Sequence, residues 1–91
     1  MYNIKSSNQF EKDYKKIKKS GQKDMQLIKN IIQRLANGEK LEPKYRDHLL
    51  IGNYKGRREC HLMPDWLLIY YIDDDTIFFE RTGTHSELFN K

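Results

Sequence analysis

The sequence contains one cysteine and no long hydrophobic run, and both shortages narrow the possible classes of protein. Cys60 has no partner within these 91 residues, so an internal disulfide is excluded and a reducing compartment is expected. No cysteine pair at metal-ligand spacing exists. No apolar run approaches the length that crosses a membrane, and no apolar signal core follows residues 1–5. We therefore expect a cytoplasmic protein that has no membrane partner.

Size and charge suggest one small domain with a polyanionic partner. Residues 1–91 are sufficient for a single domain with one modest core, and 37% apolar residues argue against disorder. The net charge of +4 is uneven, because residues 1–46 carry +7 and residues 47–91 carry −3. The basic half is typical of proteins that bind nucleic acid. A solvated lysine-rich helix that binds nothing is the simpler alternative.

The first half of the chain shows the periodicity of two helices. Apolar residues recur at helical spacing from Phe10 to Ile17 behind the N-cap residue types at 6–8, and Gly21 ends this segment. Asp24 is a candidate cap for a second helix that closes at residues 37–38. Its apolar stripe consists of Met25, Ile28, Ile31, Ile32 and Leu35. The short connection predicts an antiparallel helix hairpin.

The second half is typical of a small sheet. Residues 39–56 form a loop with Pro43, Gly52 and Gly56, and a weaker strand pattern occupies residues 2–5. Three strands are predicted at residues 57–63, 66–72 and 76–82. Turns at 64–65 and 73–75 join them, and 86–89 form a short tail. The order βααβββ predicts an α+β domain whose helix hairpin packs on one face of an antiparallel sheet.

All three histidines lie in the second half: His48 in the loop, His61 in the first of these strands and His85 after the last. Imidazole is the side chain best suited to proton transfer near neutral pH. Because strand side chains alternate between faces, a hairpin can bring His61 and Arg81 together, with the other two imidazoles arriving from loops. Several imidazoles gathered by a sheet in a basic protein suggest a metal-free nuclease.

Three segments combine these histidines with characteristic neighbours. They are Asp47-His48-x-Leu50-x-Gly52, His61-x-x-Pro64-Asp65-Trp66-x-Leu68-Ile69-Tyr70 and Phe79-Glu80-Arg81-Thr82-Gly83-Thr84-His85-x-x-Leu88-Phe89. In combination they resemble the YafQ branch of the RelE-like toxins of bacterial type II toxin–antitoxin pairs. The resemblance covers essentially the whole chain, including the lysine-rich helix hairpin. It implies the RelE-like, microbial-ribonuclease α+β fold.

The resemblance also implies an activity and partners. Members are mRNA interferases, metal-independent endoribonucleases that need no cofactor, and the YafQ branch cuts messenger RNA in the ribosomal A site. A cognate antitoxin neutralises the toxin, usually in a heterotetramer that reaches operator DNA through the antitoxin. Two alternatives stay open: a ribonuclease that needs no ribosome, and a non-catalytic nucleic-acid-binding partner of the antitoxin.

The same resemblance implies which positions form the site. They are His48, His61, Asp65, His85 and Phe89, supported by Arg81 and Trp66. Cleavage by the 2′-hydroxyl of RNA needs a base, an acid and positive charge. We expect Asp65 or His61 to be the base, with Asp65 favoured, and His85 to be the acid. Arg81 and His48 would stabilise charge on the phosphorane.

Further residues are predicted to bind RNA without reacting. The lysines expected to contact ribosomal RNA phosphates are Lys12, Lys15, Lys16 and Lys19. Those expected to hold the messenger backbone are Lys55, Arg57 and Arg58. Trp66 and Phe89 can stack on bases, although Trp66 is equally suited to the core. The three aspartates at 73–75 are interpreted as a solvated turn, and no metal site is predicted.

Overall fold

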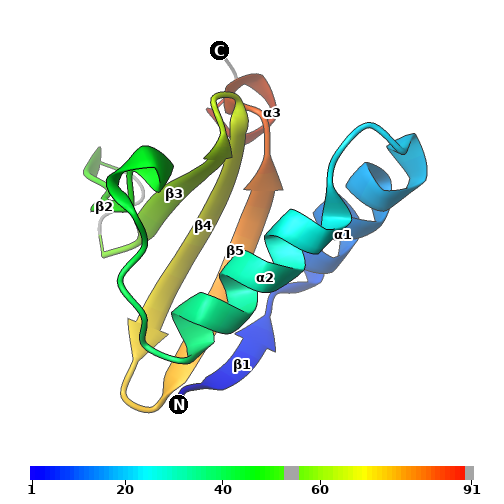
Figure 1. Cartoon of the computed structure of the whole chain (residues 1–91). Coiled ribbons are helices and arrows are strands. Elements are labelled where there is room, and N and C mark those ends of the chain that lie inside the picture. The colour runs from blue at the N-terminus through cyan, green and yellow to red at the C-terminus, as the bar shows by residue number, and fades with distance from the viewer. Residues whose placement is uncertain (53–55, 90–91) are drawn as a thin grey trace.

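The computed structural model describes residues 1–52 and 56–89, and it shows a five-stranded sheet with two long helices on one face (Figure 1). Along the chain the elements are β1 (Asn3–Ser6), α1 (Asn8–Ser20), α2 (Met25–Ala36), the 3₁₀ turn η1 (Pro43–Tyr45), β2 (His48–Leu49), β3 (Arg58–Met63), β4 (Trp66–Asp73), β5 (Thr76–Gly83) and α3 (His85–Phe89). The sheet order is β1-β5-β4-β3-β2, so the C-terminal strands form its centre.

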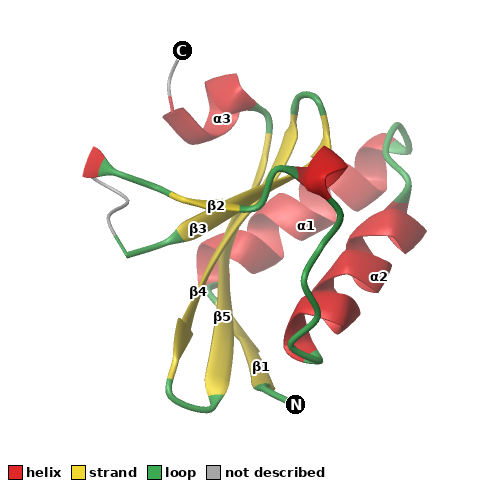
Figure 2. Cartoon of the chain, turned by 60° about the vertical axis from the view of Figure 1, so that its left-hand side comes forward, coloured by secondary structure: helices red, strands yellow, loops and turns green. Residues whose placement is uncertain are grey.

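Both long helices begin and end where the sequence predicted. The Ser7 side chain accepts a hydrogen bond from the Phe10 amide at 2.9 Å and so caps α1. Gly21 ends α1 in the left-handed conformation, with φ of 67°, which glycine adopts without a steric penalty. Asp24 caps α2 by accepting from the amides of Gln26 and Leu27. The predicted helix hairpin is therefore confirmed (Figure 2).

The three C-terminal strands are confirmed to within a residue at each end, but the sheet is not wholly antiparallel. β3, β4 and β5 form an antiparallel meander, and β2 adds an antiparallel edge. β1 instead pairs with β5 in parallel, with Asn3 opposite Thr76 and Ser6 opposite Phe79. A four-residue strand has no pattern that specifies its direction relative to its neighbour.

Besides the 3₁₀ turn η1, two short elements occur where the sequence predicted none. His48 and Leu49 pair with Arg58 and Glu59 as β2, although this stretch was predicted to be a loop. Residues 86–89, predicted as a tail, belong to α3, which begins at His85. None of the helices in the described part of the chain has the length and apolarity needed to cross a bilayer.

β4 is buried on both faces, which explains its uninterrupted apolar sequence. On the helix side, Leu68 and Tyr70 belong to the main core, which also contains Phe10, Ile17, Ile28, Ile31, Ile77 and Phe79. On the other side, Leu67 and Ile69 pack against Leu88 of α3 in a second, smaller cluster. The sheet therefore separates the main core from a second face, which, among the described residues, α3 and Leu50 cover in part (Figure 2).

Trp66 belongs to the main core, and this corrects its predicted contact with RNA bases. The side chain is fully buried, and its indole N–H donates to Thr82 Oγ1 at 3.0 Å. A base cannot stack on a ring that has no exposed surface.

The register of β3 and β4 shifts at a bulge between His61 and Met63, at the end of β3 that precedes the turn into β4.

Candidate active site

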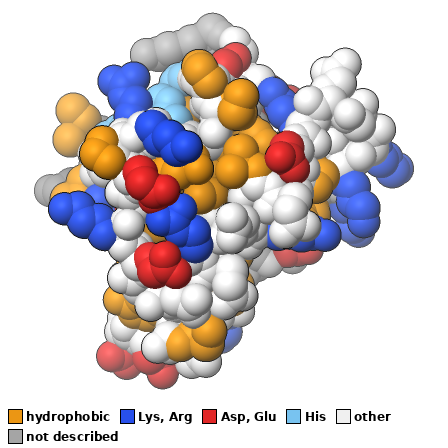
Figure 3. Space-filling model, viewed as in Figure 1, with side chains coloured by type: hydrophobic (Ala, Val, Ile, Leu, Met, Phe, Trp, Pro, Cys, Tyr) orange, Lys and Arg blue, Asp and Glu red, His pale blue; other side chains and the backbone are white. Residues whose placement is uncertain are grey.

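Three histidine rings lie in a row on the sheet face opposite α1 and α2. His48 comes from β2, His61 from β3 and His85 from the first turn of α3. The ring centroids of His48 and His61 are 6.1 Å apart, and those of His61 and His85 are 5.6 Å apart. Figure 3 shows histidine surface beside lysine and arginine side chains near the top of the molecule. The structure thus brings together the three imidazoles, while their catalytic roles stay predictions.

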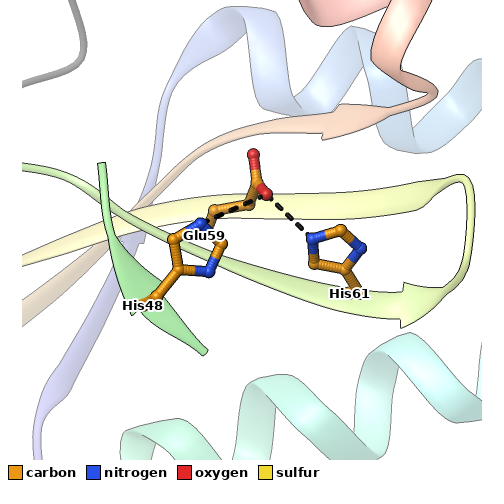
Figure 4. A group of neighbouring side chains, drawn as sticks. All are labelled: His48, Glu59 and His61. Atoms are coloured by element: carbon orange, nitrogen blue, oxygen red, sulfur yellow. Dashed lines mark ion pairs between the residues drawn. The ribbon is translucent and has the colours of Figure 1, made fainter. Parts of the chain in front are cut away.

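Glu59 joins this row, and the sequence reasoning did not assign it to the site. Its Oε1 lies 3.0 Å from His61 Nε2 and 3.7 Å from His48 Nε2 (Figure 4). Glu59 is 5% exposed, so its carboxylate is buried between the two rings. The available signal was spacing, because a residue two positions before His61 shares its face of the strand.

His48 is oriented by the backbone. Its Nδ1 lies 2.6 Å from the carbonyl oxygen of Arg46, which adopts the left-handed conformation with φ of 50°. A carbonyl oxygen only accepts, so Nδ1 carries the proton and donates. Nε2 is then the atom that faces Glu59, across the 3.7 Å gap. The short strand β2 and the turn before it together fix the direction of this ring.

Asp65 and His85 form a second pair at the other end of the row. Asp65 Oδ1 accepts from the backbone N–H of His85 at 2.9 Å and from its ring Nδ1 at 2.7 Å. The backbone hydrogen bond, then the side-chain one, hold the pKa of the Asp65 carboxyl below its ordinary value. A carboxylate in the β3–β4 turn therefore binds the start of α3 and orients its first side chain.

Phe89 lies beside this pair, one helical turn after His85. The two ring centroids are 6.4 Å apart, and the phenyl ring packs against the smaller cluster of Leu67, Ile69 and Leu88. Phe89 is half-buried, so part of its surface remains accessible next to the imidazole. This position is compatible with the predicted contact to a base, which stays a prediction.

Arg81 shares the sheet face of His61, but no hairpin joins the two. β4 lies between their strands, with His61 opposite Leu67 and Arg81 opposite Ile69, so the expected pairing is wrong. The Arg81 guanidinium instead binds Asp13 of α1, with Nε–Oδ2 at 2.8 Å and Nη2–Oδ1 at 3.3 Å. Its predicted contact with phosphate is untested.

The predicted RNA-binding cations differ in their surroundings. On α1, Lys12, Lys15 and Lys19 are exposed, whereas Lys16 pairs with Glu87 of α3 at 2.8 Å. Arg57 pairs with Glu80, and its Cζ lies 4.7 Å from the ring centroid of Tyr71. Arg58 Nε lies 3.1 Å from Asp47 Oδ1. Lys55 lies outside the described residues.

Comparisons with known proteins agree with this fold. A sequence model of the family described as "Bacterial toxin of type II toxin-antitoxin system, YafQ" matches residues 2–90. The mRNA interferase toxin YafQ of Escherichia coli K12 is 45% identical over 87 residues, which cover 94% of each chain.

Solved structures extend the similarity to three dimensions. A chain in the crystal structure of the Escherichia coli DinJ–YafQ complex has a TM-score of 0.86 at 42% identity and covers 98% of this chain and 99% of its own length. A metal-bound toxin from Helicobacter pylori has a TM-score of 0.90 at 46% identity, with 98% and 100% covered. Because the matches span nearly the whole sequence, the chain belongs to the YafQ family of bacterial toxins from type II toxin–antitoxin systems.

Proposed function

We propose that this chain is an mRNA interferase, an endoribonuclease that cuts messenger RNA by attack of the RNA's own 2′-hydroxyl. The observation that supports the proposal is the row of three imidazoles with two carboxylates, Glu59 between His48 and His61 and Asp65 beside His85. Such a row can supply a base and an acid a few ångströms apart. The mRNA interferase activity named for the Escherichia coli relative supports the same reaction.

His61 is the better candidate for the base, although the sequence favoured Asp65. The Asp65 carboxylate already accepts two hydrogen bonds from His85, and its lowered pKa makes it a poor proton acceptor. His61 Nε2 faces Glu59, whose negative charge stabilises the imidazolium that forms when the ring takes the 2′-hydroxyl proton. We therefore assign the base to His61 and make Asp65 a positioning residue.

His85 is the acid in this proposal. Its Nδ1–H donates to Asp65, so the ring presents Nε2 to the substrate and can protonate the leaving 5′-oxygen from there. The bond from phosphorus to that oxygen breaks as the 2′-oxygen bonds to phosphorus, and the products are a 2′,3′-cyclic phosphate and a 5′-hydroxyl. His48 and Arg81 are the candidates for stabilising charge on the phosphorane.

We also propose that cleavage depends on the ribosome. The exposed lysines of α1 suit contacts with ribosomal RNA phosphates, whereas Arg57 and Arg58 already have carboxylate partners. Binding in the ribosomal A site would place the messenger across the row of imidazoles. Neutralisation would come from a cognate antitoxin, by analogy with the DinJ–YafQ complex, in a heterotetramer that contacts operator DNA through the antitoxin. The proposed reaction is metal-independent.

Messenger cleavage in a purified translation system tests the proposal. The intact chain, His85→Ala and the control Asn30→Ala, an exposed position on α2, are compared with and without ribosomes. We expect cuts that need ribosomes, persist in Asn30→Ala and fall by roughly 10²-fold or more in His85→Ala, the size of a general-acid contribution. Cuts on naked RNA would favour a ribosome-independent ribonuclease. Absence of cleavage by the folded intact chain in both conditions would overturn the proposal.

A further inference from the structure

We propose that a cavity beside His61 binds one base of the messenger, the base of the nucleotide whose 2′-hydroxyl attacks. The cavity has a volume of about 490 Å³ and lies between η1, the end of β3 and the start of α2. The residues that line it include Leu27, Lys44, Tyr45, Arg46, His61 and Met63. The inference rests on the proposed function, because that function makes His61 the base.

The size and the lining of this cavity suit a flat, partly apolar ligand. Pockets for small molecules measure roughly 300–1,000 Å³ and combine apolar walls with a few polar groups. Leu27 and Met63 supply apolar wall here, and Met63 is 52% exposed, so a ligand can reach it. Tyr45 adds a half-buried aromatic ring. Proteins commonly hold unpaired RNA bases by stacking them on such rings.

Two cations border the aromatic ring and favour a ligand that carries phosphate. Lys44 and Arg46 flank Tyr45 in sequence, line the same cavity and are exposed. Lys44 Nζ lies 5.1 Å from the centroid of the Tyr45 ring. Figure 3 shows hydrophobic surface beside lysine and arginine side chains on this face of the molecule, below the histidines. An apolar wall with cations around it matches a nucleotide, whose base is flat and whose phosphate is negative.

The edge of β3 adds backbone groups that a base can pair with. β2 pairs with Arg58 and Glu59, and no other described strand pairs with the outer edge of residues 60–63. A strand edge presents N–H and C=O groups, and the edges of unpaired bases carry donors and acceptors that match them. An extended segment of a protein partner is the alternative occupant of such an edge. The two cations favour RNA over it.

The position of His61 determines which nucleotide the cavity takes. His61 lines the cavity and also belongs to the row of imidazoles, so the two sites are continuous. In the proposed reaction His61 takes the proton of the attacking 2′-hydroxyl, which belongs to the nucleotide on the 5′ side of the cut. His85 serves the leaving oxygen of the next nucleotide, and it does not line the cavity. The base in the cavity is therefore the one immediately 5′ of the cut.

Binding of the four nucleoside 3′-monophosphates to the folded chain tests the cavity without cleavage. Each has a base and a phosphate arranged as in the 5′ product. We expect NMR amide shifts at residues 44–46 and 61–64, and affinity reduced at least roughly fivefold in Tyr45→Leu, which removes one stacking surface. Tyr14→Leu is the matched control, because Tyr14 is also half-buried against the main core. Circular dichroism checks that each variant is folded.

A second pair of variants covers the case in which Tyr45→Leu does not fold. Met63→Ala shortens an exposed apolar side chain of the cavity, and Ile72→Ala shortens one on β4, with exposed fractions of 52% and 43%. Met63→Ala should weaken nucleotide binding, whereas Ile72→Ala should not. Equal binding by a folded cavity variant and its control would overturn the site. The same shifts with inorganic phosphate alone would overturn recognition of a base.

Cleavage on ribosomes then tests which nucleotide is bound. A messenger that lacks the base 5′ of the cut should be cut at least roughly fivefold more slowly by the intact chain, with little further loss in Tyr45→Leu. Slower cleavage only when the base 3′ of the cut is missing would overturn the assignment. Shifts at residues 44–46 and 61–64 with the cognate antitoxin but with no nucleotide would assign the cavity to the protein partner and overturn the inference. An intact chain that binds nucleotides here but cuts no RNA would count against the proposed function and not against the cavity.

Discussion

At the scale of single residues, Asp65 shows how an exposed side chain can control a site. Its side chain is 65% exposed, so it contributes little by packing. It nevertheless binds both the backbone and the ring of His85, and so it determines where the first side chain of α3 points. Its substitution should therefore affect the chemistry of cleavage far more than the stability of the fold.

The ionisation of Asp65 provides the first residue-scale prediction. In the folded chain its pKa should lie below the ordinary aspartate value of 3.8, and NMR titration of the carboxyl carbon measures this. Because the folded pKa is lowered, the pairing stabilises the fold above the unfolded pKa and is lost as pH falls through the folded one. His85→Ala should raise the Asp65 pKa only in part, since the backbone hydrogen bond remains. An Asp65 pKa unchanged by His85→Ala would contradict the side-chain pairing.

At the scale of elements, the ends of helices and strands followed from the sequence, but contacts between distant elements did not. Ser7, Gly21 and Asp24 act within a few residues of their own position, so local patterns were sufficient. The Asp13–Arg81 pair joins residues 68 positions apart, and only the packing of α1 against the edge of β5 creates it. Glu59 shares its strand face with His61, but the sequence alone did not assign it to the site.

The Asp13–Arg81 pair supplies the element-scale prediction. Asp13 is 9% exposed and also accepts from the Thr82 amide at 3.1 Å, so it connects α1 with β5. Asp13→Ala leaves a largely buried cation without this partner and should lower the free energy of unfolding by about 2 kcal/mol in urea titrations. A loss below about 0.5 kcal/mol would contradict a structural role, because surface substitutions fall in that range.

Variants of the same pair distinguish a structural role of Arg81 from a catalytic one. If Arg81 acts mainly through Asp13, then Arg81→Ala and Asp13→Ala should destabilise to similar extents, and the double variant should be little worse than either. Activity is then measured for folded protein below the unfolding transition. If cleavage falls much further in Arg81→Ala than in Asp13→Ala, Arg81 also contacts the phosphate, as the sequence predicted.

At the scale of the whole molecule, charge is divided between the two halves of the sequence. Exposed lysines lie on α1, whereas the imidazoles and their carboxylates lie on the opposite sheet face. The charge totals of the two halves predicted the division along the chain, whereas the strand pairing places the three imidazoles on one sheet face. The direction of β1 was not predictable, because a short strand carries no signal that distinguishes a parallel from an antiparallel neighbour.

The lysines of α1 give a whole-molecule prediction. Replacing Lys12, Lys15 and Lys19 with alanine should weaken ribosome association and reduce its dependence on salt, because fewer phosphate contacts release fewer counterions. The matched control removes the same charge elsewhere, at the exposed residues Lys5, Lys29 and Lys40. Sedimentation with ribosomes at several salt concentrations measures both effects. Equal weakening in the two variants would mean that net charge, and not the α1 surface, governs association.

The central claim is that His61 takes a proton and that His85, held by Asp65, donates one. A messenger with sulfur in place of the bridging 5′-oxygen at the cleavage site tests it on ribosomes, because a thiolate leaves without an acid. We expect this RNA to restore cleavage in His85→Ala and Asp65→Asn, but not in His61→Ala. Restored cleavage in His61→Ala, or none in His85→Ala, would contradict the assignment of acid and base.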